Sequence, residues 1–188
     1  MRDNRQLRRT RSDSDRQCFT ALYHDHALAL LGYGLRRTSN EDAVDMVSET
    51  FAVAWRRLQD VPAGDGARPW LFGVARNVLL NQGRSNRRRN ALTQRLVAAV
   101  EQVAPDETAA SDDSLLMDAA LKRLDPLDQE LLMLTCWEGL SPTEVAEALD
   151  MAAGTVRSRL HRARKNLRRL LESTHAAPTT TPGERCND

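Results

Sequence analysis

The chain has 188 residues, and its 27 basic and 26 acidic side chains leave a formal net charge of only +1. Charged residues make up 28% of the sequence and aromatic residues 4%, which favours a helical protein over a β-sandwich or barrel. No apolar run approaches the roughly 20 residues of a membrane-spanning helix, and the charged N-terminus lacks the apolar core of a secretory signal. We therefore expect a cytoplasmic protein with no membrane span.

Cysteine and histidine do not indicate a disulfide framework or a metal site. The cysteines are odd in number and far apart, at Cys18, Cys136 and Cys186, which fits a reducing compartment. His24 and His26 are two residues apart and would point to different faces of a helix. No metal and no cofactor are therefore expected.

Three helices are expected in the N-terminal half of the chain. Apolar side chains recur at spacings of three and four over residues 19–37, 43–59 and 70–89, the period of one helix face. In the second of these helices the expected apolar stripe consists of Val44, Val47, Phe51, Trp55 and Leu58. The segment 60–69, which contains two prolines and two glycines, is a predicted loop. Together these elements predict a first helical domain over residues 16–95.

A second helical domain is predicted over residues 118–172. Asp125 before Pro126 is the pattern of an N-cap followed by a proline in the first helical position. Ser141 followed by Glu144 is the pattern of a capping box. These signals predict that new helices begin at Pro126 and at Pro142.

The remaining segments are predicted to lack regular structure. Residues 96–117 contain acidic side chains but no Lys or Arg, and we expect them to form a flexible linker between the two domains. Residues 1–15 and 173–188 are polar and are expected to be a disordered arm and tail. The predicted fold is therefore all-α: two small helical domains joined by an acidic flexible linker, the second being a helix-turn-helix.

The last predicted helix has the composition of a DNA-reading element. It follows a short, capped helix after the tight connection "DMAAG", which is the helix-turn-helix layout. One stripe of this helix is apolar, and the rest is polar or basic. A solvent-exposed, basic helix fits the major groove. Its N-terminal side chains contact base edges there, and side chains further along the helix contact phosphates. Arg157 and Arg162 are the candidates for reading bases.

A second polar surface is predicted on the helix at 70–89. Amide and basic side chains of the kind that contact opened DNA share this surface: Arg76, Asn77, Asn81, Arg84 and Ser85. The spacing of Asp42, Asp45, Ser48 and Glu49 places another polar face on the preceding helix. From spacing alone that face is an ordinary solvated surface, and Phe51 and Trp55 are core residues.

Three stretches of the chain resemble a bacterial RNA polymerase sigma factor of the extracytoplasmic-function type. "NEDAVDMVSETFAVAWRRL" resembles the family's region 2.2, and "ARPWLFGVARNVLLNQGRSNRRR" resembles regions 2.3 to 2.4. "LDPLDQELLMLTCWEGLSPTEVAEALDMAAGTVRSRLHRARKNLRRLL" resembles region 4, and its segment "GTVRSRLHRAR" is the most specific match. The resemblance covers nearly all of residues 19–171.

The resemblance implies a function without catalysis, in transcription initiation and its regulation. Such a factor binds the RNA polymerase core, directs it to specific promoters and helps to open the minus-ten DNA. The first domain would bind the β′ clamp helices and the minus-ten element, with a flipped base held by the loop near 61–68. The second domain would recognise the minus-thirty-five element, and the β flap is a further expected contact. The acidic linker would run through the active-site channel, and an anti-sigma factor is an expected partner.

The resemblance also assigns residues to these partners. Those expected to bind polymerase are Asp45, Ser48 and Glu49. Those expected to bind DNA are Arg76, Asn77, Asn81, Arg84, Ser85, Arg88, Thr155, Arg157, Ser158, His161, Arg162 and Lys165. The sequence departs from the family pattern at Ser48, at Asn81 and in the turn at Asp150 and Ala152, where Gln, Asp, Gly and Pro respectively are usual. Because Asp tolerates left-handed backbone, we expect the turn to persist.

Two other classes of protein fit the sequence less well. A stand-alone helix-turn-helix regulator would bind duplex DNA without polymerase, but it would need neither the second polar surface nor an acidic linker. An enzyme is disfavoured because the chain contains no P-loop, no GxSxG and no HExxH motif.

Overall fold

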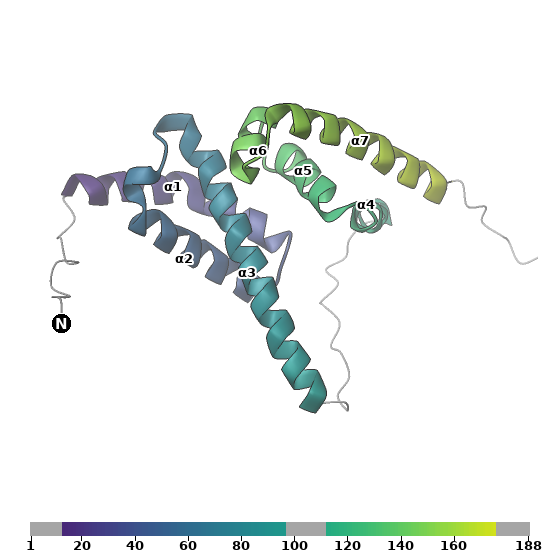
Figure 1. The fold of residues 1–188 in the computed structure, drawn as a ribbon, viewed down its shortest axis with the longest axis horizontal. Coiled ribbons are helices and arrows are strands. Elements are labelled where there is room, and N and C mark those ends of the chain that lie inside the picture. The colour runs from purple at the N-terminus through teal and green to yellow at the C-terminus, as the bar shows by residue number, and fades with distance from the viewer. Residues whose placement is uncertain (1–12, 97–111, 176–188) are drawn as a thin grey trace, which may run out of the picture. The chain divides into compact units, whose positions relative to one another are not determined.

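The structure is a computed structural model that describes residues 13–96 and 112–175, with side chains described for residues 13–84 and 115–173. Within these ranges every regular element is a helix, so the predicted all-α fold class is confirmed (Figure 1). None of these helices combines the length and apolar character of a membrane-spanning segment. The α-helices are α1 (Asp13–Leu35), α2 (Asn40–Arg56), α3 (Ala67–Leu96), α4 (Asp112–Lys122), α5 (Pro126–Cys136), α6 (Pro142–Leu149) and α7 (Ala153–His175).

The helices group into two compact units. The first contains α1, α2, α3 and α6, and the second contains α4, α5 and α7. The domain boundaries predicted from the sequence stay a prediction. Of the segments expected to lack regular structure, residues 1–12, 97–111 and 176–188 lie outside the described residues. The prediction was wrong for the described ends of these segments, because residues 13–15, 96, 112–117 and 173–175 are helical, in α1, α3, α4 and α7 respectively.

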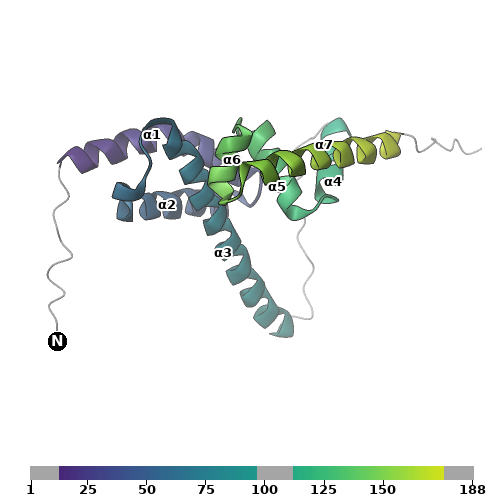
Figure 2. The ribbon, with the colours of Figure 1, turned by 45° about the horizontal axis from the view of Figure 1, so that its top comes forward.

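The first unit is organised around a small aromatic and aliphatic core. Helices α1 and α2 lie side by side, as both ribbon views show (Figures 1 and 2). Tyr33 of α1 packs edge to face on Phe72 of α3, with ring centroids 5.4 Å apart, and both side chains are buried. Gly73 of α3 meets the backbone of α6 so closely that a Cβ built there would lie 2.5 Å from the carbonyl oxygen of Ala148. Only glycine fits that approach.

One residue of the predicted α2 stripe is misplaced. Val44 is 55% exposed, whereas Val47 and Phe51 are buried as expected. The buried stripe of α2 instead begins at Ala43 and continues through Met46. It includes small and polar residues as well as large apolar ones, which a search for large apolar residues overlooks. It consists of Ala43, Met46, Val47, Thr50, Phe51 and Ala54. Val44 is therefore left on the solvent side.

The predicted loop at 60–69 is shorter in the structure, because α3 already begins at Ala67. The segment between α2 and α3 contains two short 3-10 helices, Leu58–Asp60 and Gly64–Gly66. Gly64 has φ +61°, a left-handed conformation that glycine adopts without a steric cost. Compact turns of this kind hold the start of α3 close to the end of α2.

The second unit packs α5 and α4 against α7. Its core contains Leu131 and Leu134 of α5 and Val156, Leu160 and Ala163 of α7, all essentially inaccessible to solvent. These three α7 residues belong to the apolar stripe that the sequence predicts. The other members of that stripe, Leu167 and Leu170, are half-buried.

The predicted helix starts are confirmed by their hydrogen bonds. The Asp125 carboxylate accepts from the backbone N–H of Leu127 at 3.0 Å and caps α5. At α6, the Ser141 hydroxyl accepts from the Glu144 N–H at 3.3 Å, and the Glu144 carboxylate accepts from the Ser141 N–H at 2.7 Å. This is the reciprocal capping box. Asp150, the residue after α6, has the left-handed φ of 51° that a three-residue connection to α7 at 150–152 requires.

We predict that Ser141→Ala lowers the free energy of unfolding by about 1 kcal/mol at pH 7, because an N–H at the start of α6 loses its partner. Hydrogen bonds from the Ser141 side chain and backbone hold the pKa of Glu144 below its ordinary value of 4.5. The difference between wild type and variant is therefore complete above pH 4.5 and shrinks as the pH falls through the lowered pKa. Urea denaturation followed by circular dichroism at pH 7 and at pH 3 measures both quantities. An equal difference at the two pH values would show that the Ser141 hydroxyl does not stabilise the charged Glu144 carboxylate.

Candidate nucleic-acid and polymerase interfaces

Helix α7 presents one buried and one open face. The buried face is the Val156–Leu160–Ala163 stripe. Because a helix advances about 100° per residue, the positions opposite this stripe project into solvent. All six α7 residues predicted to bind DNA are exposed: Thr155, Arg157, Ser158, His161, Arg162 and Lys165. The packing of the second unit thus leaves the whole predicted set accessible.

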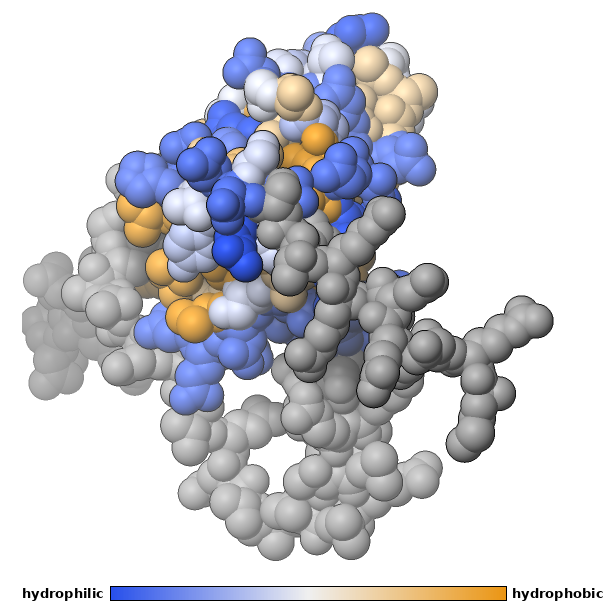
Figure 3. All heavy atoms as spheres, turned by 90° about the vertical axis from the view of Figure 1, so that its left-hand side faces the viewer, coloured by the Kyte–Doolittle hydropathy of each residue, from blue (hydrophilic) through white to orange (hydrophobic). Residues whose placement is uncertain are grey.

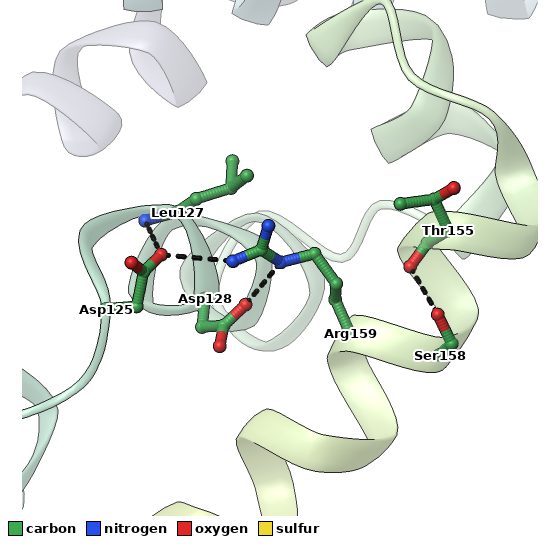
Figure 4. Close-up of polar contacts among 6 residues, drawn as sticks. All are labelled: Asp125, Leu127, Asp128, Thr155, Ser158 and Arg159. Carbon is green, nitrogen blue, oxygen red and sulfur yellow. Dashed lines mark hydrogen bonds and ion pairs between the residues drawn. The ribbon is translucent and has the colours of Figure 1, made fainter.

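Ser158 has a defined hydrogen-bonding state on this face. Its hydroxyl donates to the backbone carbonyl of Thr155 at 3.0 Å (Figure 4). The hydroxyl proton is therefore used within the helix, and the oxygen keeps its capacity to accept. An acceptor at this position suits the exocyclic amino group of adenine or cytosine in the major groove.

Arg159 belongs to the same basic run but does not share its open face. Its guanidinium turns toward the start of α5, where it contacts Asp125 and Asp128 (Figure 4). No role was predicted for this residue. The sequence shows that Arg159 lies beside the apolar stripe of α7. It does not show the partners of Arg159, because the two acids are more than thirty positions away along the chain.

On α3 the predicted DNA-binding residues fall into three groups. Asn77, Asn81 and Arg84 are exposed and are spaced by four and three residues, so they share one face. Arg76 is half-buried, and its Nε is buried with no hydrogen-bond partner among the described residues. Ser85 and Arg88 lie in α3 beyond the residues whose side chains are described. The structure thus brings three of the six together.

The predicted polymerase-binding residues lie on the open side of α2. Asp45, Ser48 and Glu49 are exposed. The Glu49 carboxylate accepts from Arg56 at 3.1 Å, while the Ser48 hydroxyl donates to the Val44 carbonyl within the helix. This face is acidic, with one of its carboxylates already paired to a neighbouring cation.

These two sets of residues meet in one groove, which the sequence did not predict. An open groove of about 800 Å³ between α2 and α3 is lined by Asp45, Ser48 and Glu49 from α2 and by Asn77 and Asn81 from α3. The lining is mixed: the acids and amides are suited to hydrogen bonding, and the apolar side chains of Ala52, Val53, Val74 and Val78 lie beside them.

A second groove in the first unit is apolar. It has a volume of about 620 Å³, lies between α1 and α2, and contains Phe19, Tyr23, Phe51 and Trp55. Phe51 is buried as expected, but Trp55 is only half-buried and Tyr23 is 49% exposed. Figure 3 shows that apolar patches lie within a mostly hydrophilic surface on one face of the molecule.

Two protein-family models match the chain in the order in which these surfaces occur. The model described as sigma-70 region 2 matches residues 22–89, which contain α2 and the described side chains of α3. The model described as sigma-70 region 4 matches residues 114–167, which contain α5, α6 and most of α7.

Similar whole proteins agree with these matches. The ECF RNA polymerase sigma factor SigL of Mycobacterium tuberculosis is 40% identical over 157 residues, which are 81% of this chain and 88% of SigL. The sigma factor RpoE of Bartonella quintana, solved with the anti-sigma factor NepR, is 28% identical with a TM-score of 0.54 and covers 85% of this chain and 94% of its own. CnrH, solved with the cytosolic domain of CnrY, is 26% identical with a TM-score of 0.55. The match covers 85% of this chain and 95% of the CnrH chain.

The two matched regions and their order define a sigma factor of the sigma-70 class, which is not an enzyme. Within that class, the identity to SigL over most of both chains shows that this chain belongs to the extracytoplasmic-function sigma factors. It directs RNA polymerase to promoters, and both the family and the function predicted from the sequence are confirmed.

We predict that Arg162→Ala weakens the binding of the polymerase holoenzyme to its upstream promoter element by about tenfold, the loss of one arginine contact to a base. Fluorescence anisotropy of a labelled promoter fragment measures this change. Arg123→Ala, which removes an exposed arginine of the same unit outside α7, is the matched control and is expected to bind as wild type. Equal affinities of the wild type and both variants would show that Arg162 does not contact the upstream element.

Proposed function

We propose that the work of this sigma factor is divided along the chain. Helix α7 reads the minus-thirty-five element, α3 contacts the opened minus-ten element, and α2 binds the β′ clamp helices of the polymerase core. The observation that carries this proposal is the exposure of the whole predicted DNA-binding set of α7 on the face opposite its buried stripe.

Reading of the upstream element by α7 is supported by the chemistry of its open face. Arg157 and Arg162 can each donate two parallel hydrogen bonds to a guanine, whereas Lys165 neutralises phosphate as a point charge. His161 lies between them on the same exposed face. The face thus combines base readers with phosphate contacts, which a sequence-specific reader requires.

Contact of α3 with opened DNA is supported by its exposed amides and arginine. Asn77 and Asn81 can pair with the edges of unstacked bases, and Arg84, one turn further along α3, can neutralise a phosphate. We include Arg76, Ser85 and Arg88 in this surface on the family pattern. We also propose that the loop at 61–68 holds a flipped base, since Gly64 allows its tight backbone.

Binding to the polymerase core is proposed at two places. On α2, the acidic face of Asp45 and Glu49 suits a basic helix pair such as the β′ clamp helices. In the second unit, an apolar groove of about 410 Å³ between α5 and α7 suits the β flap. Its lining includes Leu132, Leu167 and Leu171, with Arg164 and Arg168 at the rim.

We also propose that an anti-sigma factor holds this protein inactive. The support is a relative: RpoE of Bartonella quintana was solved with the anti-sigma factor NepR. Because polymerase and promoters occur in the bacterial cytoplasm, the protein is proposed to act there. The acidic linker is proposed to occupy the active-site channel, although most of it lies outside the described residues.

Run-off transcription tests the proposal as a whole. The purified protein is mixed with bacterial core polymerase and sheared DNA of the same organism, and the RNA 5′ ends are sequenced. We expect discrete start sites that depend on the protein and share two spaced upstream motifs. Tight binding to duplex DNA without such starts would overturn the proposal in favour of a regulator that acts without polymerase.

We predict that Asp45→Arg weakens binding to core polymerase by about tenfold or more, because it places like charges against a basic partner. Binding of the free protein to the duplex minus-thirty-five element is expected to stay unchanged. Analytical gel filtration and anisotropy with labelled protein measure the two affinities. The matched control is Asp25→Arg, the same reversal at an exposed site on α1. If Asp45→Arg binds core polymerase as tightly as the wild type, the α2 face is an ordinary solvated surface and not a polymerase interface.

A further inference from the structure

Arg159 is one of the basic residues of α7 that the predicted DNA interface does not use, and it lies directly after Arg157 and Ser158, which that interface does use. Its Nε donates to Asp128 Oδ1 at 2.7 Å, and its Nη2 donates to Asp125 Oδ1 at 3.2 Å (Figure 4). The side chains of Arg159 and Asp128 are 29% and 17% exposed, whereas that of Asp125 is 56% exposed, so the bond to Asp128 is the better shielded of the two. The guanidinium thus bridges two carboxylates of α5 from a partly enclosed position, where directional hydrogen bonds are stronger than in water.

The two acids belong to the start of α5 rather than to a mobile surface. Asp125 is the N-cap of α5, and the same Oδ1 accepts from the Leu127 N–H at 3.0 Å. Asp128 lies in the first turn, where the helix dipole favours a negative charge. The hydrogen bond that Arg159 donates to Asp128 also raises the pKa of Arg159. The contact therefore joins a fixed point of α5 to a fixed point of α7.

Apolar packing alone leaves one degree of freedom of α7 poorly specified. The Val156–Leu160–Ala163 stripe tells the helix which side to bury, but hydrophobic contact is not directional. Side-chain tips lie about 6 Å from a helix axis, so a roll of about 20° displaces them by about 2 Å. A displacement of that size breaks hydrogen bonds to base edges, whose useful distances span only about 0.5 Å. A forked, two-point contact beside the stripe resists such a roll.

We propose that Arg159 is a positioning residue for promoter recognition: held by Asp125 and Asp128, it sets the rotation of α7 about its axis and so aims Arg157, Ser158 and Arg162 at the bases. This inference rests on the proposed reading of the upstream element by α7. It assigns Arg159 a role without contact to DNA, although its residue type and its place in the basic run would suggest a phosphate contact.

The test is a double-mutant cycle with Arg159→Gln, Asp128→Asn and the variant that carries both. Each polymerase holoenzyme is titrated with a labelled duplex carrying the upstream motif from the run-off experiment and with a scrambled duplex. We expect each single change to lower the ratio of the two affinities by about tenfold, the equivalent of one misaligned base contact, and the double change to lower it no further. Affinity for the scrambled duplex is expected to change much less than this ratio, and least in the double variant, which keeps the net charge of the wild type.

A direct phosphate contact by Arg159 predicts different results. Arg159→Gln would then weaken both duplexes and reduce the slope of log affinity against log salt by about 1. Asp128→Asn would free the guanidinium and strengthen binding. Either result overturns the positioning role. A loss of all binding together with a lower melting temperature would show a merely structural role and would overturn it as well.

Two controls sharpen the comparison. Asp118 and Lys122 form an exposed ion pair on α4 in the same unit, and Asp118→Asn is expected to change neither ratio nor affinity. Arg159→Lys keeps the charge but lacks the planar fork, so we expect it to restore only part of the ratio. If the wild-type holoenzyme does not prefer the upstream motif, the proposed reading by α7 fails and the positioning role with it. If the wild type discriminates and both single variants discriminate equally well, only the positioning role fails.

Discussion

A helix at the surface of a small helical unit buries only one stripe of its surface, and this constraint determines which side chains the protein leaves for its partners. In α7, Val156, Leu160 and Ala163 are buried, and every predicted DNA-binding residue of the helix is therefore exposed to solvent. In α2, burial of Met46 and Phe51 leaves the acidic face open. Neither unit has enough helices to bury a second face of α2 or α7. Each position of these helices therefore lies either in the core or on a surface open to partners.

This constraint also explains which features the sequence could predict. The helix starts at Asp125 and Ser141 are set by neighbours within three residues, and both are confirmed. The α7 stripe is set by a period of 3.6 residues and is confirmed at its N-terminal end. Val44 was misplaced because two overlapping stripes of α2 have helical spacing, and the buried one is the stripe that begins at Ala43 and contains small residues.

Features that depend on contacts between distant residues were not predictable in the same way. The groove that unites Asp45 and Glu49 with Asn77 and Asn81 depends on how α2 and α3 cross, which no local pattern contains. The pairing of Arg159 with Asp128 joins positions 31 residues apart. In a run of basic residues, periodicity separates buried from exposed positions, but it does not show that a flanking arginine has an internal partner.

The internal pairing of Arg159 has a consequence for the charge distribution of the second unit. Asp125 and Asp128 follow an acidic segment of the sequence, and unpaired carboxylates near a DNA-reading helix would repel phosphates within a Debye length of about 8 Å. Because one guanidinium contacts both carboxylates, about half of their negative charge is cancelled where it arises. The remaining basic residues of α7 keep their positive potential, so a chain that is almost neutral as a whole can still present a cationic face to promoter DNA.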